Sequence, residues 1–154
     1  MSFITPLNIL VYEYENIIQS PLILILGIGA LKRLQVLCLT RNNLQALDAE
    51  LSQLGESLRT LALDENPLAN LPDFVCLMGS LRVLCLAATQ LDRLPERIGD
   101  LRALSLLDIS RNLITSLPAS FANLKVLYSY ITIISLNKYS MICTSNELYS
   151  LLIS

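Results

Sequence analysis

A leucine lattice with a nearly constant period is the feature of this sequence that most limits its fold. Leu34, Leu58, Leu81, Leu104 and Leu127 lie 23 or 24 residues apart. Each of the first four begins a segment close to L-x-x-L-x-L-x-x-N-x-L-x-x-L-P, as in LRTLALDENPLANLP. A fixed period of about 20 to 50 residues indicates a solenoid, in which each unit buries its apolar face against its neighbours.

The spacing inside each unit predicts a short strand followed by a turn. The fourth and sixth residues are apolar and alternate with other residues, as a strand with one buried face requires. Three residues after the strand stands an amide or hydroxyl side chain, which we expect to satisfy backbone groups of the turn and to stack as a ladder. The ladder positions are Asn42, Asn66, Thr89 and Asn112. Further apolar columns follow, so the stacked units should share one continuous core, and Pro72, Pro95 and Pro118 should fix φ where the return segments begin, with Asp48 as the exception.

The repeat resembles the leucine-rich-repeat family, and its 23-residue units with Leu-Pro resemble the intracellular class that includes the Ras-suppressor proteins. The resemblance covers about residues 34–125 and extends back to Ile28, because IGALKRL at 28–34 matches IGDLRAL at 98–104. It implies an α/β solenoid with a short parallel strand ladder on the concave face and irregular or short helical turns on the convex face. It also implies a role in holding protein partners.

The ends of the chain differ from the repeats. In the tail, Tyr130 and Thr132 occupy core positions, and only Lys138 and Glu147 are charged, although a solenoid end needs a polar outer face. We therefore expect an irregular or degenerate segment at 1–23, a partial unit plus four full repeats at 24–125, and a degenerate or foreign tail at 126–154. Uncapped ends favour self-association, and the chain is interpreted as a fragment of a longer array.

Composition argues against several classes of function. The chain has no histidine, which removes Ser-His-Asp and Cys-His nucleophiles, and its four cysteines lack the C-x-x-C spacing of zinc sites. We therefore predict a chain that is not an enzyme and that binds no metal or cofactor. The net charge of −2 provides no cationic field for nucleic acid. The apolar stretch 17–31 is interrupted and short for a bilayer, and the N-terminus lacks a basic signal region, so we expect a cytoplasmic chain without membrane contact.

Two pairs of side chains could suggest chemistry but have simpler interpretations. Cys38 and Cys85 share a column two strands apart, roughly 10 Å at ~4.8 Å per strand, beyond the ~7 Å that a disulfide allows between Cα atoms. We expect free thiols. Asp64 and Asp108 belong to units two apart and to different columns, so we expect solvated carboxylates on a polar rim rather than a catalytic pair.

The strand positions that face away from the core are the ones that indicate function. An apolar strip runs through Val36, Thr60, Val83 and Leu106 beside Cys38, Ala62 and Cys85, and charged residues border it. The predicted partner-binding residues are Val36, Cys38, Thr40, Arg41, Thr60, Ala62, Asp64, Glu65, Val83, Cys85, Ala87, Leu106, Asp108, Ser110 and Arg111. An exposed apolar strip with a polar rim is typical of a protein-binding site.

This pattern predicts a protein-interaction module, such as a signalling scaffold or regulator. Three alternatives stay open. The strip could consist of strand-forming residues without a partner, the chain could be the recognition part of a larger enzyme such as a ligase or kinase, or it could be a non-functional fragment.

Overall fold

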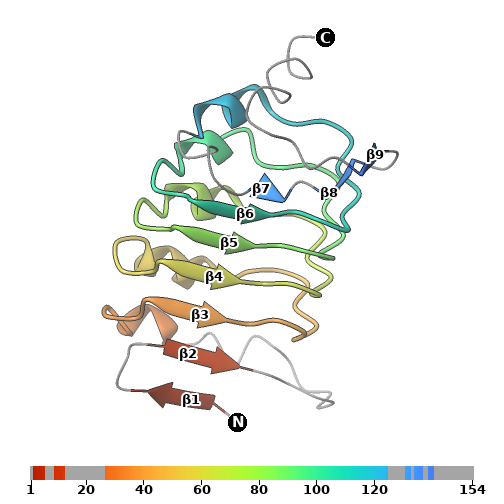
Figure 1. Cartoon of the computed structure of the whole chain (residues 1–154). Helices are drawn as coiled ribbons and strands as arrows, with labels where there is room; N and C mark the ends of the chain where they lie inside the picture. Colours follow the sequence, from red (N-terminus) through yellow and green to blue (C-terminus); the bar gives the residue numbers. More distant parts are fainter. Residues whose placement is uncertain are drawn as a thin grey trace.

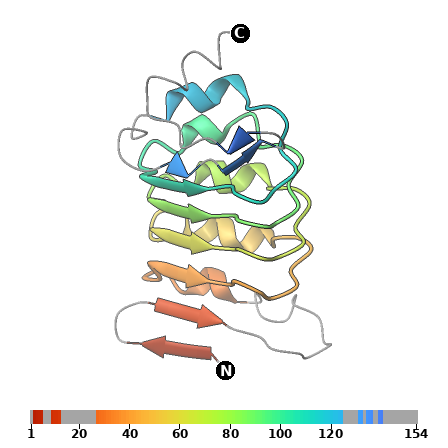
Figure 2. The same ribbon diagram turned by 45° about the vertical axis from the view of Figure 1, so that its right-hand side comes forward.

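The protein is a stack of short strands backed by short helical turns (Figures 1 and 2). The computed structural model describes residues 27–124 in full and, outside them, the backbone of the strands at 2–5, 9–12, 131–132, 134–136 and 139–140. The tail positions Tyr130, Lys138, Cys143 and Glu147 lie outside the described residues.

Within the described residues, one seven-stranded sheet follows the order of the sequence from β1 to β7. Strands β1 (Ser2–Thr5) and β2 (Ile9–Tyr12) pair antiparallel, and every later pair in this sheet is parallel. The central strands are β3 (Val36–Cys38), β4 (Thr60–Ala62), β5 (Val83–Cys85) and β6 (Leu106–Asp108). Their register pairs equivalent residues of successive units, so the predicted parallel ladder is confirmed.

The repeat register changes after the fourth full unit. Strand β7 (Ile131–Thr132) pairs with β6, and Ile131 lies opposite Leu107. A strict 23-residue period would place Tyr130 there, so the pairing occurs one residue later than the lattice gives. Strands β8 (Ile134–Leu136) and β9 (Tyr139–Ser140) form a separate antiparallel pair.

The return segments contain 3-10 turns, which form the layer behind the sheet in Figure 2. They are η2 (Ile28–Ala30), η3 (Ala49–Leu54), η4 (Asp73–Leu77), η5 (Ile98–Asp100) and η6 (Ala119–Asn123). Pro72 and Pro118 precede two of the turns with φ of −66° and −67°, as predicted. Asp48, the exception to the proline column, instead accepts the Glu50 N–H with its carboxylate. The matching segments at residues 28–34 and 98–104 both begin with a 3-10 turn.

Leucines fill the space between the two layers. The strand column at Leu37, Leu61, Leu84 and Leu107 is at most 1% exposed, and the columns of the return segments join it in one cluster. Burying such a side chain fully contributes about 1.5 to 3 kcal/mol. Because each column is apolar in every unit, the core continues along the stack, which confirms the predicted solenoid core.

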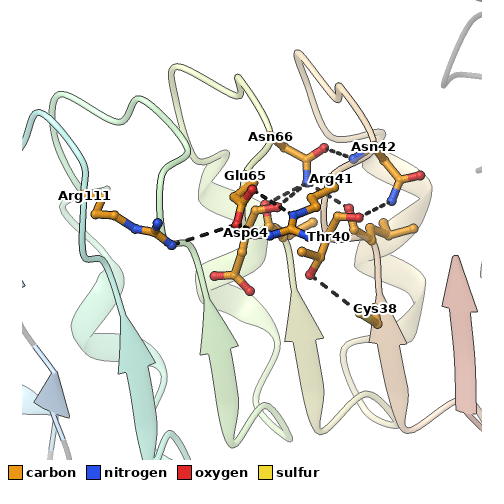
Figure 3. Close-up of polar contacts among 10 residues, drawn as sticks. Cys38, Thr40, Arg41, Asn42, Asp64, Glu65, Asn66 and Arg111 are labelled. Atoms are coloured by element: carbon orange, nitrogen blue, oxygen red, sulfur yellow. Dashed lines mark hydrogen bonds and ion pairs between the residues drawn. The ribbon is translucent and has the colours of Figure 1, made fainter. Parts of the chain in front are cut away.

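Buried asparagines tie neighbouring units together where the strands end (Figure 3). The Oδ1 atom of Asn66 accepts the N–H groups of Asn42 and Leu44 in the preceding unit, at 2.9 and 3.0 Å. Its Nδ2 atom donates to the carbonyl oxygens of Leu39 and Leu63, both at 2.8 Å. At Asn66, the predicted ladder therefore uses one amide side chain to satisfy buried backbone groups of two units at once.

Thr89 is the weak position of this ladder. Its hydroxyl lies within hydrogen-bonding distance of the Leu86 carbonyl oxygen (2.8 Å) and of Asn112 Oδ1 (3.0 Å). Within residues 27–124, the hydroxyl oxygen of Thr89 accepts no N–H group from the preceding unit, although its backbone carbonyl oxygen accepts the Ala69 N–H at 3.2 Å. The Leu68 N–H donates to the Asn66 carbonyl oxygen instead. An asparagine at this position would offer the acceptor that Asn66 and Asn112 offer to their own preceding units.

We therefore expect Thr89→Asn to raise the free energy of unfolding by about 1 kcal/mol, the net value of a typical hydrogen bond. Thr89→Val should lower it by a similar amount, because the Leu86 carbonyl oxygen loses its hydroxyl donor. Urea denaturation of the two variants beside the wild-type chain measures both changes. A less stable Thr89→Asn variant would show that threonine is the better fit to this turn.

Candidate partner-binding face

The face of the sheet that points away from the 3-10 turns, here called the concave face, carries two adjacent columns of side chains. The register of β3 to β6 places equivalent residues of four units side by side. The first column is Val36, Thr60, Val83 and Leu106, and the second is Cys38, Ala62, Cys85 and Asp108. All of them are half-buried, whereas the residue between them in each strand is buried. The predicted strip is thus continuous across four strands.

Two of the predicted surface positions are wrong, because Ala87 and Ser110 are buried, at 4% and 8% exposed. Both follow the strands, where the backbone turns toward the ladder. The Asp64 carboxylate accepts the Ala87 N–H at 2.8 Å, and the Asp108 carboxylate accepts the Ser110 N–H at 2.9 Å. These backbone contacts and the burial of both side chains remove Ala87 and Ser110 from the exposed surface of the face.

The rim of the concave face carries an ion-pair network (Figure 3). Glu65 accepts two hydrogen bonds from the Arg41 guanidinium, at 2.8 and 3.0 Å, and lies 4.0 Å from an Arg111 nitrogen. The hydrogen bonds from Arg41 hold the pKa of Glu65 below its ordinary value. These three residues share the same turn position and a positive φ between 54° and 61°. Because the pairs are largely exposed to water and salt, each contributes little to stability.

The carboxylates and thiols at the centre of this face are more enclosed than the sequence predicts. The pKa of Asp64 is raised above its ordinary value, mainly by burial and further by the nearby charge of Asp108, although the hydrogen bond from the Ala87 N–H partly opposes this. Asp64 is therefore less solvated than the sequence predicts. Burial, with Asp64 and Asp108 adding to it, raises the pKa of the Cys85 thiol to about 11. Cys38, Cys76 and Cys85 are free, as predicted for the first and last of them. A protonated Cys85 is a poor nucleophile, so this thiol contributes packing surface to the centre of the face.

In the part of the chain that the structure describes, no group of three or more histidine, cysteine, aspartate or glutamate side chains is placed to hold a metal ion. Across the same residues, no helix combines the length and the apolar character needed to span a bilayer.

The family model described as Leucine Rich Repeat matches residues 103–124, which, apart from Ala103, lie within the fourth full unit. The chain also resembles a solved leucine-rich-repeat protein of Leptospira interrogans, with 26% sequence identity and a TM-score of 0.53. The chain folds as a leucine-rich-repeat solenoid. The match covers 72% of this chain and 34% of the Leptospira protein, so the chain spans about a third of that protein's length. No curated protein sequence matches the chain.

Leucine-rich-repeat domains are typically binding modules for other proteins and are typically not enzymes. In this leucine-rich-repeat solenoid, the predicted residues of the strands and rim lie on one face, apart from the buried Ala87 and Ser110.

Arg59 and Arg82 were not selected as candidate binding residues from the sequence. Arginine stands at the second position of two consecutive units, and this recurrence is the signal in the sequence that could have identified the pair.

Proposed function

We propose that this chain is a protein-interaction module that binds a partner through the concave face of its solenoid. The observation that carries the proposal is the unbroken strip of Val36, Thr60, Val83 and Leu106, which a partner could cover in one contact. Half-buried apolar side chains that adjoin one another gain most when a partner excludes the remaining water, as in the centre of a protein interface.

The surroundings of the strip support a protein ligand rather than a small one. The rim network of Arg41, Glu65 and Arg111 can exchange its exposed pairs for contacts with a partner at low cost, because those pairs contribute little. Asp64 and Asp108 give the centre of the face an acidic character that would favour a partner with a basic or hydrogen-bond-donating group. A helix or an extended strand could present such a combination.

The experiment compares two leucine substitutions in one repeat. Leu106 belongs to the strip, whereas Leu113 is 55% exposed and lies outside the strand. We expect Leu106→Glu to reduce the recovery of a bound partner at least about tenfold in affinity purification, the scale of a central interface contact. Leu113→Glu introduces the same charge and should leave recovery unchanged. Urea denaturation establishes that both variants are folded, and equal recovery with both would remove the strip from consideration.

We further propose that the chain belongs to the intracellular, Ras-suppressor-like class and acts in the cytoplasm as a scaffold or regulator of a signalling assembly, with residues 24–125 as the binding unit. The 23-residue units with Leu-Pro support this assignment. The free thiols of Cys38, Cys76 and Cys85 also fit a reducing compartment. Fluorescence microscopy of the tagged chain tests the location, and a secreted or membrane-bound pool would contradict it.

A further inference from the structure

A groove lined by cations lies along the edge at which the strands begin, at the other end of the strands from the asparagine ladder. Its volume is about 500 Å³. Lys32, Arg33, Arg59 and Arg82 line it, against the carboxylate of Glu56. Arg59 directly precedes β4 and Arg82 directly precedes β5, on the left side of the sheet in Figure 1. The groove is therefore separate from the concave strip.

The backbone stacks the two central arginines in consecutive units. The carbonyl oxygen of Arg59 accepts the N–H groups of Arg82 and Val83, at 2.8 and 2.9 Å, so the residues occupy equivalent places one strand apart. Strands are spaced by ~4.8 Å, and like charges on neighbouring strands repel each other. This arrangement costs stability in the free chain and would be relieved by a bound anion.

Within residues 27–124, the guanidinium groups of Arg59 and Arg82 make no ion pair and no hydrogen bond. Most of the other arginines in that range pair with a carboxylate. The arginines paired with carboxylates there are Arg41, Arg93, Arg97 and Arg111, each within 4.0 Å of its partner. Arg59 and Arg82 are both exposed, so their forked donors are available to a carboxylate in the bidentate geometry that arginine favours.

A second hollow of about 730 Å³ adjoins the groove and shares Lys32, Glu56 and Ser80 with it. Leu77, which is 58% exposed, lines this hollow. The two hollows together place cations beside an apolar side chain. Within the described residues, neither lining contains an aromatic ring on which a nucleic-acid base could stack. This combination favours a peptide over a nucleic acid.

We propose that the groove binds an extended acidic segment of a protein partner. Carboxylates of the segment pair with Arg59 and Arg82, and an apolar side chain of the segment rests against Leu77. The site extends the binding surface beyond the concave face, and it acts independently of the strip. A charged partner would be recognised at the edge where the strands begin. At the other end of the strands, Arg41 and Arg111 already pair with Glu65.

Fluorescence anisotropy on the full chain tests the groove with a labelled synthetic peptide of alternating glutamate pairs and single leucines. We expect the double variant Arg59→Gln/Arg82→Gln to bind at least about tenfold more weakly, because two charge-assisted contacts are lost. The matched control is Arg93→Gln/Arg97→Gln, which has the same net charge and leaves the groove intact, and it should bind like the wild-type chain. Arg59→Lys/Arg82→Lys, which preserves the charge, should retain intermediate affinity.

Three results would overturn the proposal. They are failure of the wild-type chain to bind the peptide, equal weakening by the control double variant, and binding of an oligothymidylate of equal charge as tightly as the peptide. Leu106→Glu should bind the peptide normally, so the outcome here is distinct from the outcome for the concave face. Urea denaturation of each variant shows that any loss of affinity comes from a folded chain.

Discussion

Replacing Asn112 with alanine should lower the free energy of unfolding by about 3 to 5 kcal/mol, because several buried backbone groups lose their partners together. The side chain is 4% exposed. Its Oδ1 atom accepts the N–H groups of Thr89 and Leu91, both at 3.0 Å, and its Nδ2 atom donates to the carbonyl oxygens of Leu86 and Ile109, at 2.7 and 2.9 Å. Alanine replaces none of these bonds.

The measurement is urea denaturation combined with hydrogen exchange. The exchange of the Thr89 and Leu91 amides should accelerate more than that of neighbouring amides, because these two N–H groups lose their acceptor. Asn70→Ala is the matched control, since Asn70 is exposed and its side chain makes no hydrogen bond within residues 27–124. A similar small effect of both substitutions would mean that the ladder is not a source of stability.

The ladder also shows how far the sequence predicts this fold. The period, the register of β3 to β6, the core columns and the ladder positions follow from the pattern, because the same residue type recurs where the same structural role recurs. The sequence did not predict that the Asp64 carboxylate accepts the Ala87 N–H of the next unit, or that the Asp108 carboxylate accepts the Ser110 N–H of its own unit, since both contacts depend on side-chain conformation rather than on the repeat pattern.

Of the two candidate sites, the sequence predicts the concave face but not the groove. The concave columns could be predicted because strand alternation alone decides which side chains face outward. The groove at Arg59 and Arg82 could not, because it depends on the path of the loops between η3, η4 and the following strands. The sequence marks the recurring arginine, but only the structure shows that, within residues 27–124, Arg59 and Arg82 form no ion pair with a carboxylate while Arg41 and Arg111 do.

Gly99→Ala should be nearly as damaging as the loss of Asn112, although it adds only one methyl group. A Cβ atom at Gly99 would meet the Ser120 carbonyl oxygen and the Ser120 carbonyl carbon, the latter at 2.7 Å. Both are backbone atoms of η6, which is stacked on η5, so relief requires the two units to separate. We expect a loss of about 3 kcal/mol, at the upper end of ordinary overpacking. The urea midpoint should fall while the slope of the transition stays the same.

Two other glycines supply graded controls for this prediction. Gly29 occupies the same repeat position, but a Cβ atom there would meet the side chain of Gln53, which can rotate away. Gly79 has no atom within 4 Å of its added Cβ. Gly29→Ala should therefore cost under about 1 kcal/mol, and Gly79→Ala should be neutral or slightly stabilising, because it restricts the unfolded chain. The repeat does not itself demand glycine, since Ser52 and Cys76 fill the equivalent position in other units. Equal midpoints for all three variants would contradict the close stacking of η5 on η6.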